Sequence, residues 1–176
     1  MRYAIGIDLG KNGAIVIRDL EKNDIQTMVM PLVGNQFDMH LMSDILDEFA
    51  GEDAMVGIED LRAIYGASAS ATFTFGFICG ATEALIAAHK IPYRKINAKV
   101  WQREAFKGIP EIRKPSKIDK NGKKRKGPID TKAMAEIAAK RLFPNVDLRK
   151  SPRAKKNHDG IIDALLISWY IEQNYK

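Results

Sequence analysis

Length and composition set the first limits on this protein. The chain has 176 residues, of which 45% are hydrophobic and 28% are charged, and this balance predicts one globular domain over residues 1–176. Its single cysteine, Cys79, excludes an internal disulfide framework and a multi-cysteine zinc site, and its apolar neighbours favour a buried, unreactive thiol. No apolar run approaches about 20 residues and the N-terminus lacks a signal-peptide pattern, so we expect no membrane association and a cytoplasmic location.

Charge is distributed unevenly along the chain, which carries a net charge of +6. Residues 107–156 contain 17 Lys or Arg and 5 Asp or Glu, so this segment carries +12 and the remaining 126 residues carry −6. One strip of the molecule therefore attracts polyanions, whereas the rest does not.

Short apolar segments alternate with segments of helical periodicity. We expect strands at residues 3–9, 14–19, 25–30, 54–60 and 91–97, the first two being joined by a tight turn at GKNG. We expect helices at residues 38–50, 67–90, 98–106, about 130–142 and about 158–172. Three consecutive strands form an antiparallel meander, and the later strands return parallel to the first by right-handed crossovers. The sequence thus predicts an α/β fold with a mixed five-stranded sheet flanked by helices.

The densest basic stretch, Arg113–Pro128, has no apolar periodicity and contains two glycines and two prolines. We therefore expect a long mobile loop at about 107–129. A solvated linker would explain its composition, but a phosphate-binding arm also explains the charge segregation. We expect phosphate contacts from Lys114, Lys117, Lys123, Lys124, Arg125, Lys126, Arg153, Lys155 and Lys156, with Arg149 and Lys150 extending the same surface.

Acidic residues follow two of the predicted strands. Asp8 ends the first strand, and Glu59, followed by Asp60, ends the fourth. Functional sites of open α/β sheets lie near the carboxyl ends of their strands. The last predicted helix adds Asp159 and Asp163, which are four residues apart and share one face.

If this helix packs across the first strand, its two acids meet Asp8 and Glu59. Four neighbouring carboxylates repel one another strongly unless cations neutralise them. An all-oxygen site suits Mg²⁺ or Mn²⁺, and two such ions could activate a water and stabilise the leaving oxygen of a phosphodiester.

Each acid also has a structural interpretation. Asp8 could bond to turn amides, Glu59 or Asp60 could be a surface residue, and Asp159 could cap the last helix in competition with Asn157. Asp163 is harder to explain in this way, because a carboxylate within an apolar helix is costly without a partner.

Four segments of the chain together resemble the RuvC-like Holliday junction resolvases, especially the compact versions encoded by phages: IGIDLGKNGAIVI, GIED, SASATFTFGFICGATEALIAAHKIPYRKINAKVWQ and HDGIIDALLISWYI. The resemblance covers most of residues 3–106 and 130–172. It implies a ribonuclease H-like fold, a homodimer, and cleavage of branched DNA that depends on Mg²⁺ or Mn²⁺. It matches Asp8, Glu59 and Asp163 to family acids. The paired last-helix positions are three apart in many members, but residue 160 is Gly here, so Asp159 and His158 both remain candidates for the fourth ligand.

Two alternatives come from other classes of protein. DLGKNGAIV also resembles the first phosphate loop of the actin and sugar-kinase superfamily, whose ATP site needs a second such domain. A non-catalytic protein that binds branched DNA is the other alternative, although the complete acid set favours an enzyme.

Two matched cuts in a four-way junction need two acid clusters, so we expect an isologous dimer. The 67–90 helix is the candidate interface, because Gly76 and Gly80 permit close approach and Phe73 and Phe77 supply apolar area. Alternatively, this helix simply packs on its own sheet, where small residues also help. Tyr65 and Phe75 are candidates for stacking on unpaired bases.

Overall fold

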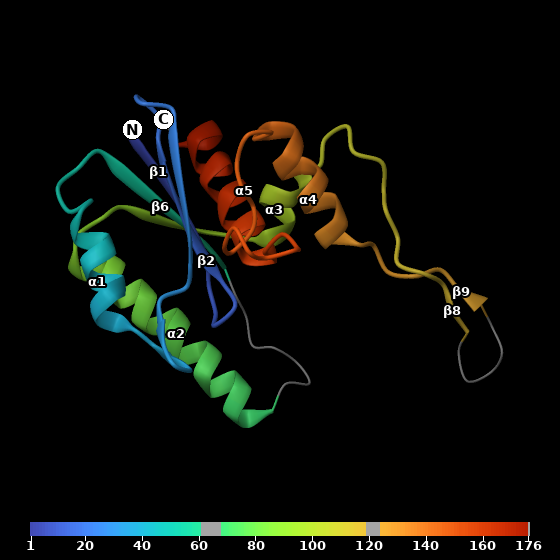
Figure 1. Ribbon diagram of the computed structural model, residues 1–176, viewed down its shortest axis with the longest axis horizontal. Coiled ribbons are helices and arrows are strands. Elements are labelled where there is room, and N and C mark those ends of the chain that lie inside the picture. Colours follow the sequence, from blue (N-terminus) through green and yellow to red (C-terminus); the bar gives the residue numbers. More distant parts are fainter. Residues whose placement is uncertain (61–67, 119–123, 176) are drawn as a thin grey trace.

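The computed structural model describes residues 1–60, 68–118 and 124–175. Five strands form its central sheet: β1 (Tyr3–Asp8), β2 (Ala14–Asp19), β3 (Asp24–Val29), β6 (Ala54–Glu59) and β7 (Tyr93–Ile96). They lie in the order β3-β2-β1-β6-β7 (Figure 1). Strand β1 pairs antiparallel with β2 and parallel with β6, so the predicted mixed five-stranded sheet is confirmed.

Helices cover both faces of this sheet, as Figure 1 shows. One face carries α1 (Met39–Asp47) and α2 (Ala69–Ala88), and the other carries α3 (Ala98–Ala105), α4 (Thr131–Leu142) and α5 (Asp159–Asn174). Each helix begins with a side chain that accepts a hydrogen bond from a first-turn amide: Asp38, Ser68, Asn97, Asp130 and His158, respectively. The sequence did not predict the short hairpin of β4 (Leu32–Val33) and β5 (Gln36–Phe37).

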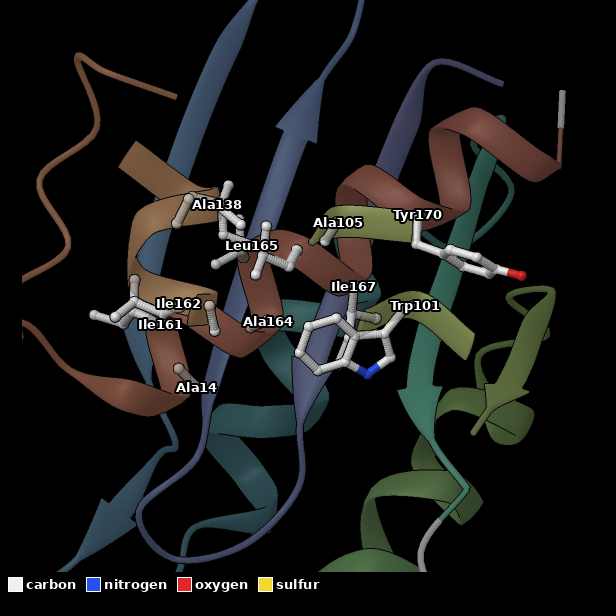
Figure 2. Close-up of a cluster of buried hydrophobic side chains, with 14 of the residues drawn as sticks. Ala14, Trp101, Ala105, Ala138, Ile161, Ile162, Ala164, Leu165, Ile167 and Tyr170 are labelled. Carbon is white, nitrogen blue, oxygen red and sulfur yellow. The ribbon is translucent and has the colours of Figure 1, made fainter. Parts of the chain in front are cut away.

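Helix α5 lies directly against the sheet because two glycines leave room for it. Gly6 of β1 pairs with Gly57 of β6 in the parallel register. A Cβ atom on Gly6 would lie 1.9 Å from the carbonyl oxygen of Ala164, and one on Gly57 would lie 2.7 Å from Ile171 Cγ1. The close approach holds α5 across β1 and β6, where its apolar side chains share a core with those of α3 and α4 (Figure 2).

Helix α2 packs much less closely. Its buried residues are Ile78, Thr82 and Ile86, whereas Phe73 and Phe77 are 76% and 47% exposed. The helix does pack on its own sheet through Ile78 and Ile86, which share a core with residues of β1 and β6. Gly76 and Gly80 do not help this packing, because a Cβ atom on either would have no neighbour within 4 Å.

By length and composition alone, α2 could also cross a membrane, which corrects the expectation that no apolar run approaches this length. Only 17% of its apolar stretch is buried, so α2 presents an apolar surface that the described chain leaves uncovered.

The basic segment that we expected to be a loop forms a two-stranded ribbon instead (Figure 1). Arg113 bridges Ile129, the Lys114 amide donates to the Pro128 carbonyl, and β8 (Lys117–Ile118) pairs antiparallel with β9 (Lys124–Arg125). Gly127 permits this pairing, because a Cβ atom there would lie 1.9 Å from the Lys114 carbonyl oxygen. The prediction failed because hydrogen bonding between the two backbone segments requires no apolar periodicity.

Candidate active site

Three elements bring the predicted acids to one end of the sheet. Asp8 and Glu59 end the parallel neighbours β1 and β6, and Asp159 and Asp163 lie in the first turns of α5. The N-terminus of α5 packs so closely on the β1–β2 turn that a Cβ atom on Gly160 would lie 2.7 Å from the Asn12 carbonyl oxygen and 3.0 Å from Asp8 Oδ2. The helix therefore reaches the Asp8 carboxylate itself.

The electrostatics of the acids show that they form one cluster. Burial, and then the negative charges of Asp163, Glu59 and Asp159, raise the pKa of Asp8 to about 8, and Lys132 opposes this effect. Burial, followed by the charges of Glu59 and Asp159, raises the pKa of Asp163 to about 7. These half-buried carboxyls resist ionisation because no cation compensates them fully.

Glu59 is held by a residue that the sequence analysis did not single out. The indole nitrogen of the fully buried Trp101 donates a hydrogen bond of 3.2 Å to Glu59 Oε1. Burial raises the pKa of Glu59, and this hydrogen bond opposes the rise. Trp101 therefore fixes the carboxylate at the end of β6 and partly offsets the cost of burying its charge.

The N-terminus of α5 departs from what the sequence predicted. His158 caps the helix, its Nδ1 accepting from the Ile161 amide at 3.3 Å, so neither Asp159 nor Asn157 is the cap. Asp159 is 56% exposed and forms an ion pair with Lys132 of α4. Burial lowers the pKa of His158, which favours its neutral form.

The position three residues before Asp163 cannot carry an acid in this protein. Residue 160 is the glycine that lies against the β1–β2 turn, and any side chain there would overlap the backbone of Asn12 and Gly13. An acid paired with Asp163 on the same helix face must therefore come one position earlier, at Asp159.

A pocket of about 870 Å³ opens above Asp8, Asp159 and Asp163. Its other walls come from the β1–β2 turn, the start of α2, the start of α4 and the chain before α5. Cations of three different segments line it: Lys11, Lys132 and Lys156. Phe75 also lines it and lies against Gly10, where a Cβ atom would be 3.3 Å from the Phe75 ring.

The remaining predicted residues lie in several places. Asp60 is exposed, and its amide donates to the Ile96 carbonyl at the end of β7. Tyr65 and Lys123 lie outside the described residues. Lys117 and Lys124 belong to the paired strands β8 and β9 of the ribbon. Several predicted phosphate-binding residues are exposed: Lys114, Arg125 and Lys126 on the ribbon, and Arg153, Lys155 and Lys156 before α5.

Cys79 is half-buried rather than buried. Burial, and then the charge of Asp8, raise the pKa of its thiol to about 11, which agrees with an unreactive thiol.

Three residues of the site were not predicted from the sequence: Lys11, Lys132 and Trp101. Lys11 stands between two glycines in the predicted turn, so its position beside Asp8 could have been recognised. Lys132 was one of many basic residues, and only the packing of α4 against α5 brings it to Asp159.

The donor set consists of carboxylate oxygens, which suit Mg²⁺ or Mn²⁺ rather than softer metals. Within residues 1–60, 68–118 and 124–175, no three His, Cys, Asp or Glu side chains are arranged as a group that could hold a metal ion. The carboxylates are close enough to perturb one another, but they do not form a ready metal centre.

No protein-family model and no curated protein match this chain. Solved structures, in contrast, are similar to this chain. The chain is similar to Thermus thermophilus RuvC in complex with a Holliday junction substrate, with 13% identity and a TM-score of 0.53 over 96% of this chain and 91% of that one. The fold is RuvC-like. A second Thermus thermophilus RuvC structure is similar over 96% of this chain and 95% of that one, with 13% identity and a TM-score of 0.50. This similarity confirms the RuvC-like, ribonuclease H-like fold that the sequence resemblance implied. At 13% identity it does not establish the activity, which has to be argued from the residues of the site.

Proposed function

We propose that the protein is a structure-selective endodeoxyribonuclease that resolves Holliday junctions and related branched DNA by metal-dependent phosphodiester hydrolysis. The acid cluster carries this proposal. Asp8, Glu59 and Asp163 come from three elements and lie at one end of a RuvC-like sheet. Burial raises the pKa of all three, and the charges of neighbouring acids raise the pKa values of Asp8 and Asp163 further. A fold does not gather half-buried carboxylates for stability, because each ionised one destabilises the others.

The chain's own residues divide the chemical work. Asp8, Glu59, Asp159 and Asp163 would hold Mg²⁺ or Mn²⁺, with Trp101 keeping Glu59 in place. Two such ions would supply an activated water and stabilise the leaving oxygen. Bound cations would also remove the repulsion between the carboxylates and so allow them to approach one another. Lys132, which is paired with Asp159, keeps that carboxylate compensated when no ion is bound.

The positive charge around the acids supports a polyanionic substrate. Lys11, Lys132 and Lys156 line the pocket, and the ribbon adds Lys114 and Lys126. Such residues bind phosphates whatever the base sequence, which suits an enzyme that selects DNA by its branched shape. The similar Thermus thermophilus RuvC is itself bound to a Holliday junction substrate.

Paired cuts require a second copy of the chain, and the exposed face of α2 is the candidate interface for this dimer. Phe73 and Phe77 are exposed beside Gly76 and Ala69, where they line a shallow apolar hollow. A helix that combines exposed rings with small residues can pack closely on its copy. Two copies related by a two-fold axis would present two acid clusters to the two-fold-symmetric junction.

A cleavage assay tests the proposal directly. A labelled four-way junction and a linear duplex of the same sequence would be incubated with the protein, with Mg²⁺ or with EDTA. We expect symmetric nicks in the junction with Mg²⁺ and none in EDTA or in the linear duplex. Tight binding of the junction without cutting, under all metal conditions, would favour the non-catalytic DNA-binding protein instead.

A further inference from the structure

A second hollow, of about 400 Å³, lies beside the acid-lined pocket. Lys150, Ala154, Lys155, Lys156, Asn157 and His158 line it. The last three of these residues also line the acid-lined pocket, so the two hollows meet along one wall. The sequence placed these lysines on a general basic surface, whereas the structure gathers them around one concave site.

The chain that carries these lysines is held in one conformation. The Arg149 guanidinium donates to both carboxylate oxygens of Asp147, at 2.9 and 2.8 Å, and to the Pro152 carbonyl at 3.1 Å. Arg149 also forms an isolated bridge with Asn157, whose side chain donates to Glu136 at 2.8 Å. Arg149 therefore ties the loop together, and its charge is compensated by Asp147 within the protein.

The charges of this hollow lack internal compensation. No carboxylate forms an ion pair with Lys150, Lys155 or Lys156 within the described part of the chain. The acids nearby are engaged elsewhere. Asp147 pairs with Arg149, and Asp159 pairs with Lys132. Glu136 pairs with Lys140. Three lysines that line one hollow and have no ion-pair partner favour an anion at this place.

We propose that this hollow is a phosphate subsite, which binds one backbone phosphate of the DNA strand whose neighbouring phosphate lies over the acid cluster. Lys150 and Lys155 contact this phosphate, and Lys156 stands between the two sites. The inference rests on the proposed function, because it assumes that the strand to be cut crosses the acid-lined pocket. The wall shared by the two hollows then sets the register of the strand over the acids, since a phosphate held in one fixes its neighbour in the other.

Binding measurements with modified junctions test this subsite without relying on cleavage. Each strand would carry a single uncharged methylphosphonate at one position near the branch point, and affinities would be measured in EDTA. With the wild-type protein, we expect one position at which losing the charge weakens binding about 10-fold. With a Lys150→Gln/Lys155→Gln variant, the same modification should weaken binding less than about 2-fold, because its partner is already absent.

The matched control is Lys22→Gln/Lys90→Gln, which removes two exposed lysines that line neither hollow. It should retain the full methylphosphonate penalty. Undiminished penalties at every position in Lys150→Gln/Lys155→Gln would overturn the subsite, while cleavage of the junction by the wild-type protein would still support the nuclease. Failure of the wild-type protein to bind junction DNA at all would overturn both. Calorimetric binding of inorganic phosphate that needs Lys150 and Lys155, together with undiminished penalties, would assign the hollow to free phosphate and overturn the DNA contact.

Discussion

Helices α5 and α2 break the usual relation between polarity and burial in opposite directions. Helix α5 is largely buried, yet it carries the half-buried Asp163, whose carboxyl pKa is raised to about 7, first of all by burial. Helix α2 is largely apolar, yet it leaves Phe73 and Phe77 in solvent. A buried acid and an exposed apolar face are each unfavourable in an isolated monomer. We therefore expect bound cations to compensate the acids of α5 and another surface to cover α2, in line with the proposed function.

The glycines around α5 and those within α2 also differ in how closely other atoms pack against them. Gly6, Gly57 and Gly160 have no space for a side chain because α5 lies against the backbone of the sheet and of the β1–β2 turn. Gly76 and Gly80 of α2 have nothing within 4 Å. The same residue type therefore marks a contact already made around α5 and an open surface on α2.

The largest effect should come from removing the half-buried Asp163 carboxylate. In Asp163→Asn, cleavage of a four-way junction should fall about 100-fold or more, because an amide holds divalent cations poorly. Binding of the junction should be unchanged or tighter, since a negative charge near the phosphates is lost. Gel assays of cutting with Mg²⁺ and of binding in EDTA would measure both. A variant that cuts at the wild-type rate would refute the role of Asp163.

The uncovered face of α2 should decide the oligomeric state. We expect light scattering during size exclusion to give a mass near twice 19.7 kDa for the wild-type protein. Gly80→Leu should shift this mass toward the monomer and abolish paired cutting, because the added side chain fits the monomer but obstructs close helix approach. Substitution of Lys126 by Gln on the ribbon is the control and should leave the mass unchanged. A wild-type mass of 19.7 kDa at micromolar concentration, with and without junction DNA, would exclude the dimer.

One substitution made in both regions should change stability in opposite directions. Gly6→Ala should lower the free energy of unfolding by about 3 kcal/mol, because its Cβ would lie 1.9 Å from the Ala164 carbonyl oxygen. Gly76→Ala should raise it by about 0.5–1 kcal/mol in the monomer, because alanine favours a helix and meets no neighbour here. Denaturant titration at submicromolar concentration would measure both, and an equal loss in the two variants would contradict the packing difference.

The smallest effect should appear in the pH dependence of stability. The pKa values of Asp8 and Asp163, about 8 and about 7, exceed the value of about 3.9 expected in the unfolded chain. Their contribution to stability is therefore complete below about pH 4 and is lost as the pH rises to about 8. In EDTA, the melting temperature should fall by roughly 5–10 °C between pH 5 and pH 8.

Two further measurements connect this pH dependence to the acid cluster. Mg²⁺ at pH 8 should restore much of the lost melting temperature, because it compensates the ionised carboxylates. Asp163→Asn should make the pH dependence shallower, since one of the two titrating groups is gone. If the wild-type protein and the variant in EDTA lost the same melting temperature, the acids would not be the cause.

Much of the fold could be predicted from the sequence alone. The short apolar runs of β1 and β2 and the helical periodicity of α5 are local patterns, and each of these three elements has the type that was expected. The residues of the acid cluster were also predictable, because an acid at a strand end and an acid within an apolar helix both depart from the local pattern. The ribbon was not predicted because backbone hydrogen bonds, such as the one from the Lys114 amide to the Pro128 carbonyl, leave no periodic pattern of apolar side chains in the sequence.

What the sequence determined by itself was therefore the strands of the central sheet and the five helices, the uneven charge and the acids Asp8, Glu59, Asp159 and Asp163. Only the tertiary structure decided how these parts meet. It showed that Gly160 excludes an acid three residues before Asp163, that Lys132 pairs with Asp159, and that Trp101 holds Glu59. The physical reason is that local patterns record what each element needs from its own neighbours, whereas contacts between distant segments depend on the distance at which two backbones pack. In this protein the glycines of β1, β6 and α5 permit a short distance between α5 and the sheet. This close packing brings Asp163 near enough to Asp8 to raise its pKa.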